Sequence, residues 1–181
     1  LIPNFDAWQS GLWAMVTRPV NTRWSFSGGA RVDFAGQSVQ TFDQVRYNQN
    51  DEIVDTLRLL QGFQRNYANW SASLGFVYNP SKQYRWRFNL ASSFRLPTVP
   101  ELGADGVHHG TFRHEQGNPN LLSERGWHLD VAWEAETRNS HWSVTPFFYY
   151  FDRFIFLNPT GQFSPLQGAG QLFAYEQAQA L

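Results

Sequence analysis

Apolar and polar residues alternate along the chain with a period of two in several long segments. The segment from Tyr84 to Arg95 shows this period most clearly. Its even positions are Tyr84, Trp86, Phe88, Leu90, Ser92 and Phe94, and its odd positions are Arg85, Arg87, Asn89, Ala91, Ser93 and Arg95. Because successive side chains of a β-strand point to opposite faces of the sheet, this pattern predicts a strand with one apolar face.

Five further segments alternate in the same way, with more interruptions. They are residues 8–17, 23–34, 67–79, 125–137 and 141–156, and another segment begins near residue 172. The chain is therefore predicted to be all-β, with six strands and a truncated seventh. Many of these strands are longer than the five or six residues that are usual in globular proteins.

The connections between these strands alternate between short and long. Short turns are predicted near 18–22, 79–83 and 138–140, and long loops near 35–66, 96–124 and 158–171. In an up-and-down antiparallel sheet every second connection lies at the same edge, so the short turns share one rim and the long loops the other. Long strands, one apolar face and this alternation of loops are typical of a bacterial transmembrane β-barrel.

A soluble β-sandwich would show the same alternation of residues, because its inner faces are also apolar. The placement of the aromatic rings favours the barrel. Large rings gather near the short turns, as the interfacial girdle of a membrane barrel requires. The residues concerned are Trp24, Tyr78, Tyr84, Trp86 and Trp142.

The composition agrees with the barrel and excludes several other classes. Aromatic residues make up 17% of the 181 residues and charged residues only 16%, and the net charge is −1. Nucleic acid is therefore not expected as a partner, because no basic patch is present to bind it. There is no cysteine, which excludes disulfides and thiolate chemistry. Both ends are expected to be interior to a longer protein.

The region from residue 94 to residue 124 resembles the TonB-dependent outer-membrane receptors. Barrels of that family commonly carry the pattern F-R-x-P-x-x-x-E-L at a strand end and, after a loop, G-N-P-x-L-x-x-E. The matching residues here are Phe94, Arg95, Pro97, Glu101 and Leu102, then Gly117, Asn118, Pro119, Leu121 and Glu124.

The resemblance implies that the chain is a β-barrel segment of a 22-stranded barrel, which outer-membrane lipid would surround. The implied protein has its own N-terminal plug domain and is driven by the TonB energising complex through an N-terminal region. Neither the plug nor that region is among these residues. The long loops would be extracellular, and the implied activity is import of a scarce nutrient such as a metal ion or a ferric siderophore.

The predicted loop 96–124 contains the candidate metal or substrate site. Its hypothetical metal ligands are His108, His114, Glu101 and Asp105, with His109 and Glu115 as further substrate contacts. Imidazole and carboxylate groups bind zinc or copper without thiolates. The bound metal would be transported substrate, as zinc, copper or an iron complex, and no resident cofactor is expected. The alternative is that these loop residues are solvent-exposed or hydrogen-bonded.

A second set of candidates lies on the polar faces of the strands. Arg85, Arg87 and Arg95 could line a lumen that guides an anionic substrate. The alternative is that these arginines form ion pairs with Asp130, Glu134, Glu136 or plug residues. No nucleophile accompanies His128 and Asp130, so an enzyme is not expected.

Three hypotheses for the function follow. The first is a nutrient importer driven through TonB. The second is a passive or adhesive outer-membrane barrel, whose long loops bind another surface. The third is a soluble carbohydrate-binding β-sandwich, in which exposed aromatic rings would stack on sugars.

Overall fold

The computed structural model describes residues 4–48, 53–108, 110–166 and 170–181. Most of the described chain is β-strand, and ten of its strands form one sheet. Among these residues no helix is long and apolar enough to span a membrane. The strands that form the wall of the sheet are β1 (Phe5–Pro19), β2 (Trp24–Val39), β5 (Phe63–Tyr78), β6 (Tyr84–Arg95), β9 (Glu124–Glu136), β10 (His141–Val144), β11 (Phe147–Phe163) and β12 (Gln171–Ala180).

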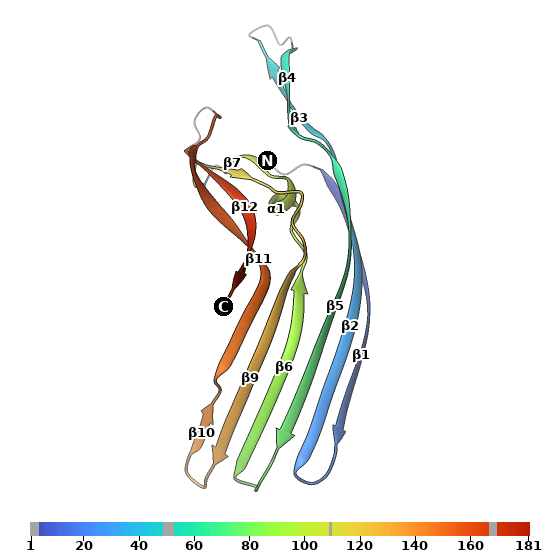
Figure 1. Cartoon of the computed structure of the whole chain (residues 1–181), viewed down its shortest axis with the longest axis vertical. Helices are drawn as coiled ribbons and strands as arrows, with labels where there is room; N and C mark the ends of the chain where they lie inside the picture. The colour runs from blue at the N-terminus through green and yellow to red at the C-terminus, as the bar shows by residue number, and fades with distance from the viewer. Residues whose placement is uncertain (1–3, 49–52, 109, 167–169) are drawn as a thin grey trace.

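Strands that follow one another in the wall pair antiparallel, in the order β1, β2, β5, β6, β9, β11, β12. Figure 1 shows the turns between them at the lower end of the sheet, and α1, β7 and the β3–β4 hairpin near its upper end. The predicted all-β, up-and-down antiparallel barrel segment is confirmed. The predicted strand over 141–156 is divided at residues 145 and 146, so that β10 pairs with the lower end of β9 and β11 pairs with its upper part.

The register of the strands places like residues in rows across the sheet. Phe26, Phe76, Phe88 and Val131 are successive partners on one face, and Ser27, Gly75, Asn89 and Asp130 form the adjacent row on the other. The side chains of the apolar face are exposed, including Leu90 and Leu129. In the described chain no second layer covers this face, so the β-sandwich hypothesis is wrong.

Aromatic rings border the apolar face at two levels. Near the turns, Trp24 stacks on Tyr78 with ring centroids 4.3 Å apart, and Trp86 lies 6.5 Å from Trp133. Six residues above Trp133 on β9, Trp127 meets the edge of Trp70. At about 3.3 Å per residue the two levels are roughly 20 Å apart along the strand, close to the height of about 25 Å that a transmembrane barrel requires.

Two of the long connections contain secondary structure that the sequence pattern does not reveal. The first holds a hairpin of β3 (Phe42–Tyr47) and β4 (Ile53–Leu60). The second holds α1 (Val99–Gly103), β7 (Asp105–His108) and β8 (Arg113–Gln116). The hairpin of β7 and β8 joins the main sheet, because β8 pairs in parallel with the start of β12.

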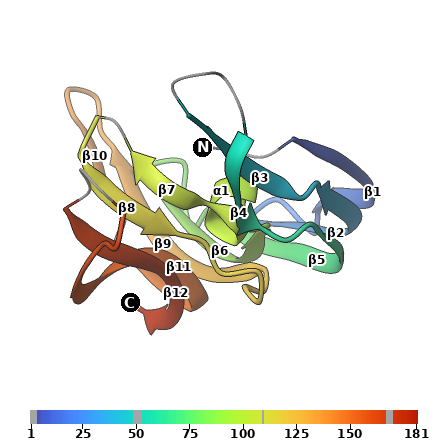
Figure 2. The same cartoon turned by 90° about the horizontal axis from the view of Figure 1, so that it is seen from above.

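The segment from residue 96 to residue 123 folds onto the polar face of the wall. Three polar side chains of β2 and β5 hold it: Gln37 donates to the Pro97 carbonyl, Arg65 to the Leu121 carbonyl, and Asn69 to Ser123 Oγ. A small core of Leu102, Leu121 and Ile155 is buried there. Seen from above, the wall is an open arc with α1 on its inner side (Figure 2). The polar face is therefore the concave one.

Candidate functional site

The base of the long loop 96–123 is tied to the wall by one arginine and two glutamates. Arg95, at the end of β6, donates to both oxygens of Glu101 at 2.9 and 2.8 Å, and to Glu124 of β9 at 3.2 Å. Glu101 also accepts from the Thr98 amide and completes a capping box on α1. These three charged residues belong to the two motifs and connect β6, α1 and β9.

The glycine of the second motif allows the loop to pack closely on α1. A Cβ atom added to Gly117 would lie 2.5 Å from the Gly103 nitrogen and 2.7 Å from the Ala104 nitrogen. The amide of Asn118 donates to the Glu101 carbonyl at 2.8 Å. No side chain fits between these two backbones, which explains glycine at this position.

Above this base, the hairpin of β7 and β8 contains a buried histidine with two partners. His114 Nε2 lies 2.6 Å from Asp105 Oδ1, and Nδ1 lies 2.8 Å from Ser164 Oγ, in the connection between β11 and β12. An ionised carboxylate only accepts hydrogen bonds, so Nε2 donates to Asp105; in the neutral imidazole Nδ1 is then the acceptor for the Ser164 hydroxyl. The His114 side chain is 6% exposed. Both ring nitrogens are thus engaged within the protein.

Glu115 points to the opposite side of the same hairpin and is also paired. It accepts from Arg113 Nε at 2.7 Å and from the Tyr175 hydroxyl of β12 at 3.2 Å. The Arg113 guanidinium lies 5.4 Å from the ring centroid of Phe173. These side-chain contacts join the hairpin to β12, in addition to the parallel backbone pairing of β8 with β12.

Three of the four predicted metal ligands, Glu101, Asp105 and His114, have described side chains, and these three do not come together. Asp105 and His114 are in contact, but Glu101 is bound to Arg95 at the loop base. His109 lies outside the described residues, as does the side chain of His108. No group of three or more His, Asp or Glu residues able to hold a metal is found among the residues described.

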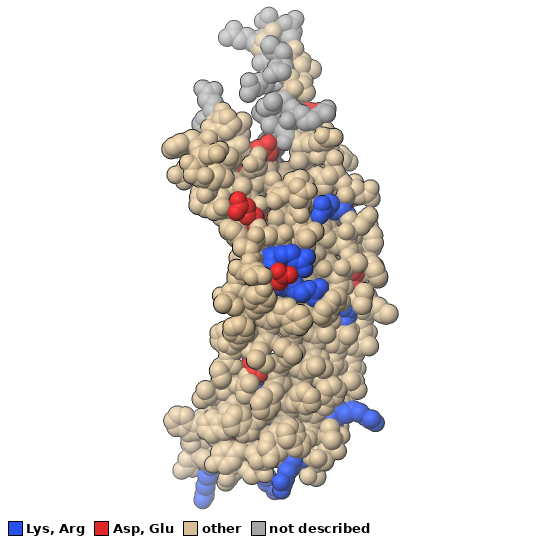
Figure 3. All heavy atoms as spheres, in the orientation of Figure 1, with Lys and Arg blue, Asp and Glu red and all other residues tan. Residues whose placement is uncertain are grey.

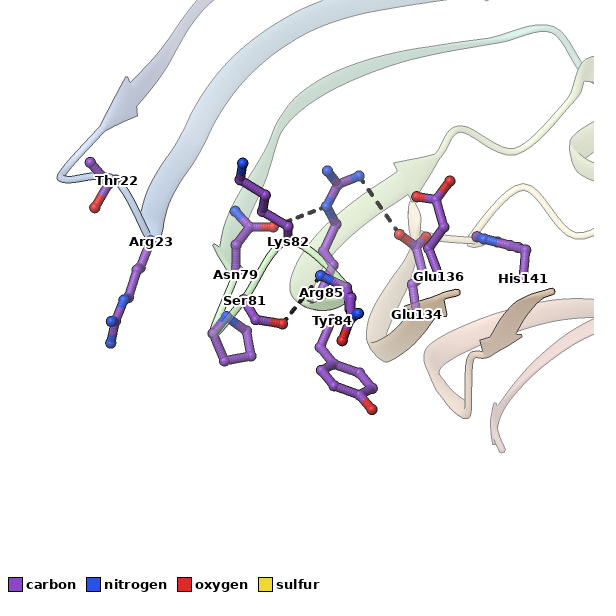
Figure 4. Close-up of a pocket in the computed structure, with 12 residues that line it drawn as sticks. Thr22, Arg23, Asn79, Ser81, Lys82, Tyr84, Arg85, Glu134, Glu136 and His141 are labelled. Carbon is purple, nitrogen blue, oxygen red and sulfur yellow. Dashed lines mark hydrogen bonds and ion pairs between the residues drawn. The ribbon is translucent and has the colours of Figure 1, made fainter. Parts of the chain in front are cut away.

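Arg85 and Arg87 lie near the lower end of the inner face, far along the wall from the hairpin. Both pair with Glu134 of β9: Arg85 Nη1 is 3.7 Å from its carboxylate, and Arg87 donates to it. Figure 4 shows Arg85 between Asn79 and Glu134, with Glu136 and His141 beside them. These residues line an open cavity of about 480 Å³. The three predicted arginines therefore lie at two separate places. Arg85 and Arg87 lie near the short turns, and Arg95 lies at the loop base.

Further up the inner face, another arginine pairs within a small polar cluster. Arg31 donates to both oxygens of Asp33 at 2.6 Å, and Gln9 donates to Asp33 at 3.1 Å. Gly11 makes room for this cluster, because a Cβ there would lie 2.5 Å from Asp33 Oδ1. Asp33 is 1% exposed, whereas about half of Arg31 remains accessible.

An aromatic row on the inner face was not predicted as part of a site. Phe147, Tyr149 and Phe151 of β11 lie one above another, and Tyr149 stacks on His128 with centroids 4.4 Å apart. Residues 147–151 are apolar at both alternating positions, and this pattern is the signal in the sequence that could have predicted aromatic rings on the inner face. Ser164 and Tyr175 were also missed, and nothing in the sequence marks them as partners of His114 and Glu115.

The residues that form the loop base belong to the two motifs that resemble the TonB-dependent receptors. The sequence profile of the family described as TonB dependent receptor-like, beta-barrel matches residues 1–180. The chain belongs to this family. TonB-dependent receptors are transporters, not enzymes, and lie in the bacterial outer membrane. No curated protein is significantly similar to the chain in sequence.

Solved structures of TonB-dependent receptors share the fold. A double mutant of the Serratia marcescens hemophore receptor HasR, in complex with its hemophore HasA and heme, superposes with a TM-score of 0.73 at 16% identity, over 95% of this chain and 30% of that one. The copper transporter OprC gives 0.66 at 13% identity, over 96% and 25%. The siderophore receptor PirA from Pseudomonas aeruginosa gives 0.56 at 12%, over 97% and 38%. The chain thus spans about a third of such receptors.

Proposed function

We propose that this chain forms part of the barrel wall of a receptor that imports a scarce nutrient across the outer membrane by TonB-coupled active transport. The observation that carries the proposal is the two-sided wall. Its outer face is exposed hydrocarbon, while its concave face is lined by ion-paired side chains and receives the segment 96–123. Such a face suits a hydrated lumen that holds the protein's own N-terminal plug.

The proposed substrate is a metal ion or a metal complex. HasR was solved with heme, OprC is a copper transporter and PirA is a siderophore receptor. In this chain the side chains of Arg31, Arg85 and Arg87 are each about half exposed toward the lumen although they are ion-paired. Part of each guanidinium therefore stays accessible to an anionic complex, such as a ferric siderophore, or to the plug.

We place the first substrate contact at the hairpin of β7 and β8, on the rim that carries the long loops. This rim would face the outside of the cell. His108, His109 and Glu115 are the proposed contacts. His114 and Asp105 have the separate role of fixing the hairpin, because both are engaged with each other and His114 also with Ser164.

Uptake by the full-length receptor tests the proposal. Cells that express it are given radiolabelled zinc, copper or ferric siderophore, with and without deletion of the TonB gene. Active import predicts accumulation of at least one of these substrates, which TonB deletion abolishes. Accumulation that continues without TonB would indicate a passive pore, and absence of uptake with retained surface adhesion would indicate an adhesive barrel.

Histidine variants separate the contact role from the fixing role. In the receptor, His108→Ala with His109→Ala should weaken substrate binding while the barrel assembles normally. Unchanged affinity in this double variant would remove both residues from the site. Competition by an unlabelled ferric complex against the labelled substrate would show that the site binds ferric complexes.

A further inference from the structure

On β5, β6 and β9 the outer face of the wall carries charge only above the upper level of rings. On β9 the outward positions below Arg125 are Trp127, Leu129, Val131, Trp133 and Ala135. The outward positions of β5 and β6 at these levels are likewise uncharged. In Figure 3 the lower part of the visible face shows few charged atoms between a band at mid-height and the basic side chains at the lower tips. Arg125 is thus the first charge above the hydrocarbon band.

Arg125 is held in place without a carboxylate partner. Its guanidinium carbon lies 4.4 Å from the ring centroid of Trp70, and Nη1 donates to the Trp70 carbonyl and to Ser92 Oγ, both at 3.1 Å. In the part of the chain that the structure describes, no ion pair within 4.0 Å joins Arg125 to an acidic residue. Both hydrogen bonds use Nη1.

A second arginine lies beside it because of a bulge in β11. Asp152 is the cross-strand partner of Arg125, and Arg153 follows with a φ of 59° where the register with β12 shifts. Arg153 Nε donates to Asp152 Oδ2 at 3.1 Å, which keeps its side chain next to this face. Left-handed backbone is costly for a residue other than glycine. Arg125, Asp152 and Arg153, here called the outer arginine patch, have a net charge of +1.

We propose that the outer arginine patch binds a phosphate group of lipopolysaccharide in the outer leaflet. This assignment rests on the proposed orientation, with the long loops outside. The planar, permanently charged guanidinium matches phosphate oxygens in pairs. The patch lies next to Trp70 and Trp127, at the level where headgroups meet hydrocarbon. Acyl chains of the same lipid would lie on the apolar rows below.

Lipid titration of the full-length receptor tests this site. The receptor is purified in detergent and titrated with lipopolysaccharide, with dephosphorylated lipopolysaccharide, and with inorganic phosphate, and bound lipid is counted by native mass spectrometry. Each arginine near a membrane surface contributes about a fivefold change in binding. Arg125→Gln and Arg153→Gln should each weaken binding of the phosphorylated lipid by about that factor. Inorganic phosphate should compete only weakly.

Arg18→Gln is the matched control. Arg18 also faces outward, but it lies beside the short turn at the other end of β1, so its removal should leave lipopolysaccharide binding unchanged. Three results would overturn the proposal: equal affinity in the wild type and the Arg125→Gln, Arg153→Gln double variant, equal binding of the dephosphorylated lipid, or an equal loss in Arg18→Gln. If Arg125→Gln fails to assemble, the test depends on Arg153→Gln alone, because the Arg153 side chain is partly exposed. The lipid titration does not depend on transport, so it tests the outer arginine patch even if the uptake experiment shows no import.

Discussion

Single residues of the loop site show what sequence patterns can and cannot predict. Asp105 and His114 were both candidates for a shared site, and the structure places them in contact. The third member, Ser164, is 50 residues away from His114 and lies in a connection without any motif. A serine hydroxyl in a loop carries no periodic signal, so only the folded arrangement of β8 beside β12 reveals its role.

Replacement of His114 by alanine should loosen the hairpin of β7 and β8 while the wall stays intact. The substitution removes the hydrogen bonds of the ring to Ser164 and to Asp105, which is about a third exposed, at a cost of about 0.5–1.5 kcal/mol for each bond. Hydrogen–deuterium exchange of the full-length receptor should show faster exchange at residues 105–116 and no change in β5 and β6. His141→Ala, exposed at the short turns, is the control. Equal protection of the hairpin in both variants would contradict the assigned role.

At the scale of elements, the two-residue period was sufficient to predict the wall strands, because membrane and lumen impose opposite demands on alternate residues. The period weakens where the upper ends of β2 and β5 lie beneath the loop. There Ala35, Val39 and Tyr67 of the inner face are buried. The short strands β7 and β8 are four residues each, too short to show a period, and their pairing with β12 is not local in sequence.

The two faces of β6 should respond very differently to the same substitution. Leu90 lies on the outer face in register with Leu74 and Leu129, near the middle of the apolar band. Leu90→Arg should reduce barrel stability by about 2–4 kcal/mol, the cost of arginine at the bilayer midplane. Ser93→Arg, on the inner face, should assemble nearly as well as the wild type. Heat-modifiable gel mobility of the receptor in outer membranes measures folded barrel, and equal losses would mean that the faces are exchanged.

The loop base offers a prediction about backbone packing. In Gly117→Ala the added methyl group would meet the backbone nitrogens of Gly103 and Ala104, which cannot move without disturbing α1. Overpacking of this kind costs about 1–3 kcal/mol. The thermal midpoint of the purified receptor should fall, and substrate affinity with it. Gly170→Ala, where the nearest atom is 3.1 Å away in an outer connection, should have a smaller effect.

For the whole molecule, the sheet is an arc with two edges rather than a closed barrel. β1 is paired only with β2, and every residue from Phe5 to Pro19 is exposed. The lower part of β11, from Phe147 to Tyr150, pairs only with β9. The chain spans 25–38% of the receptors that share its fold, so the rest of the barrel would cover these edges in the complete protein.

Open strand edges predict how the 181-residue chain behaves when it is expressed alone. Unpaired N–H and C=O groups along β1 are a template for pairing with another copy, and the exposed hydrocarbon face adds to this tendency. Refolded in detergent, the isolated chain should elute as oligomers in size-exclusion chromatography with light scattering. Proline at Ala7 and Gln9 of the edge strand should shift it toward monomer, because proline cannot donate to a strand ladder. A monodisperse wild-type monomer with protected β1 amides would show that the arc closes on itself or covers its edge in some other way.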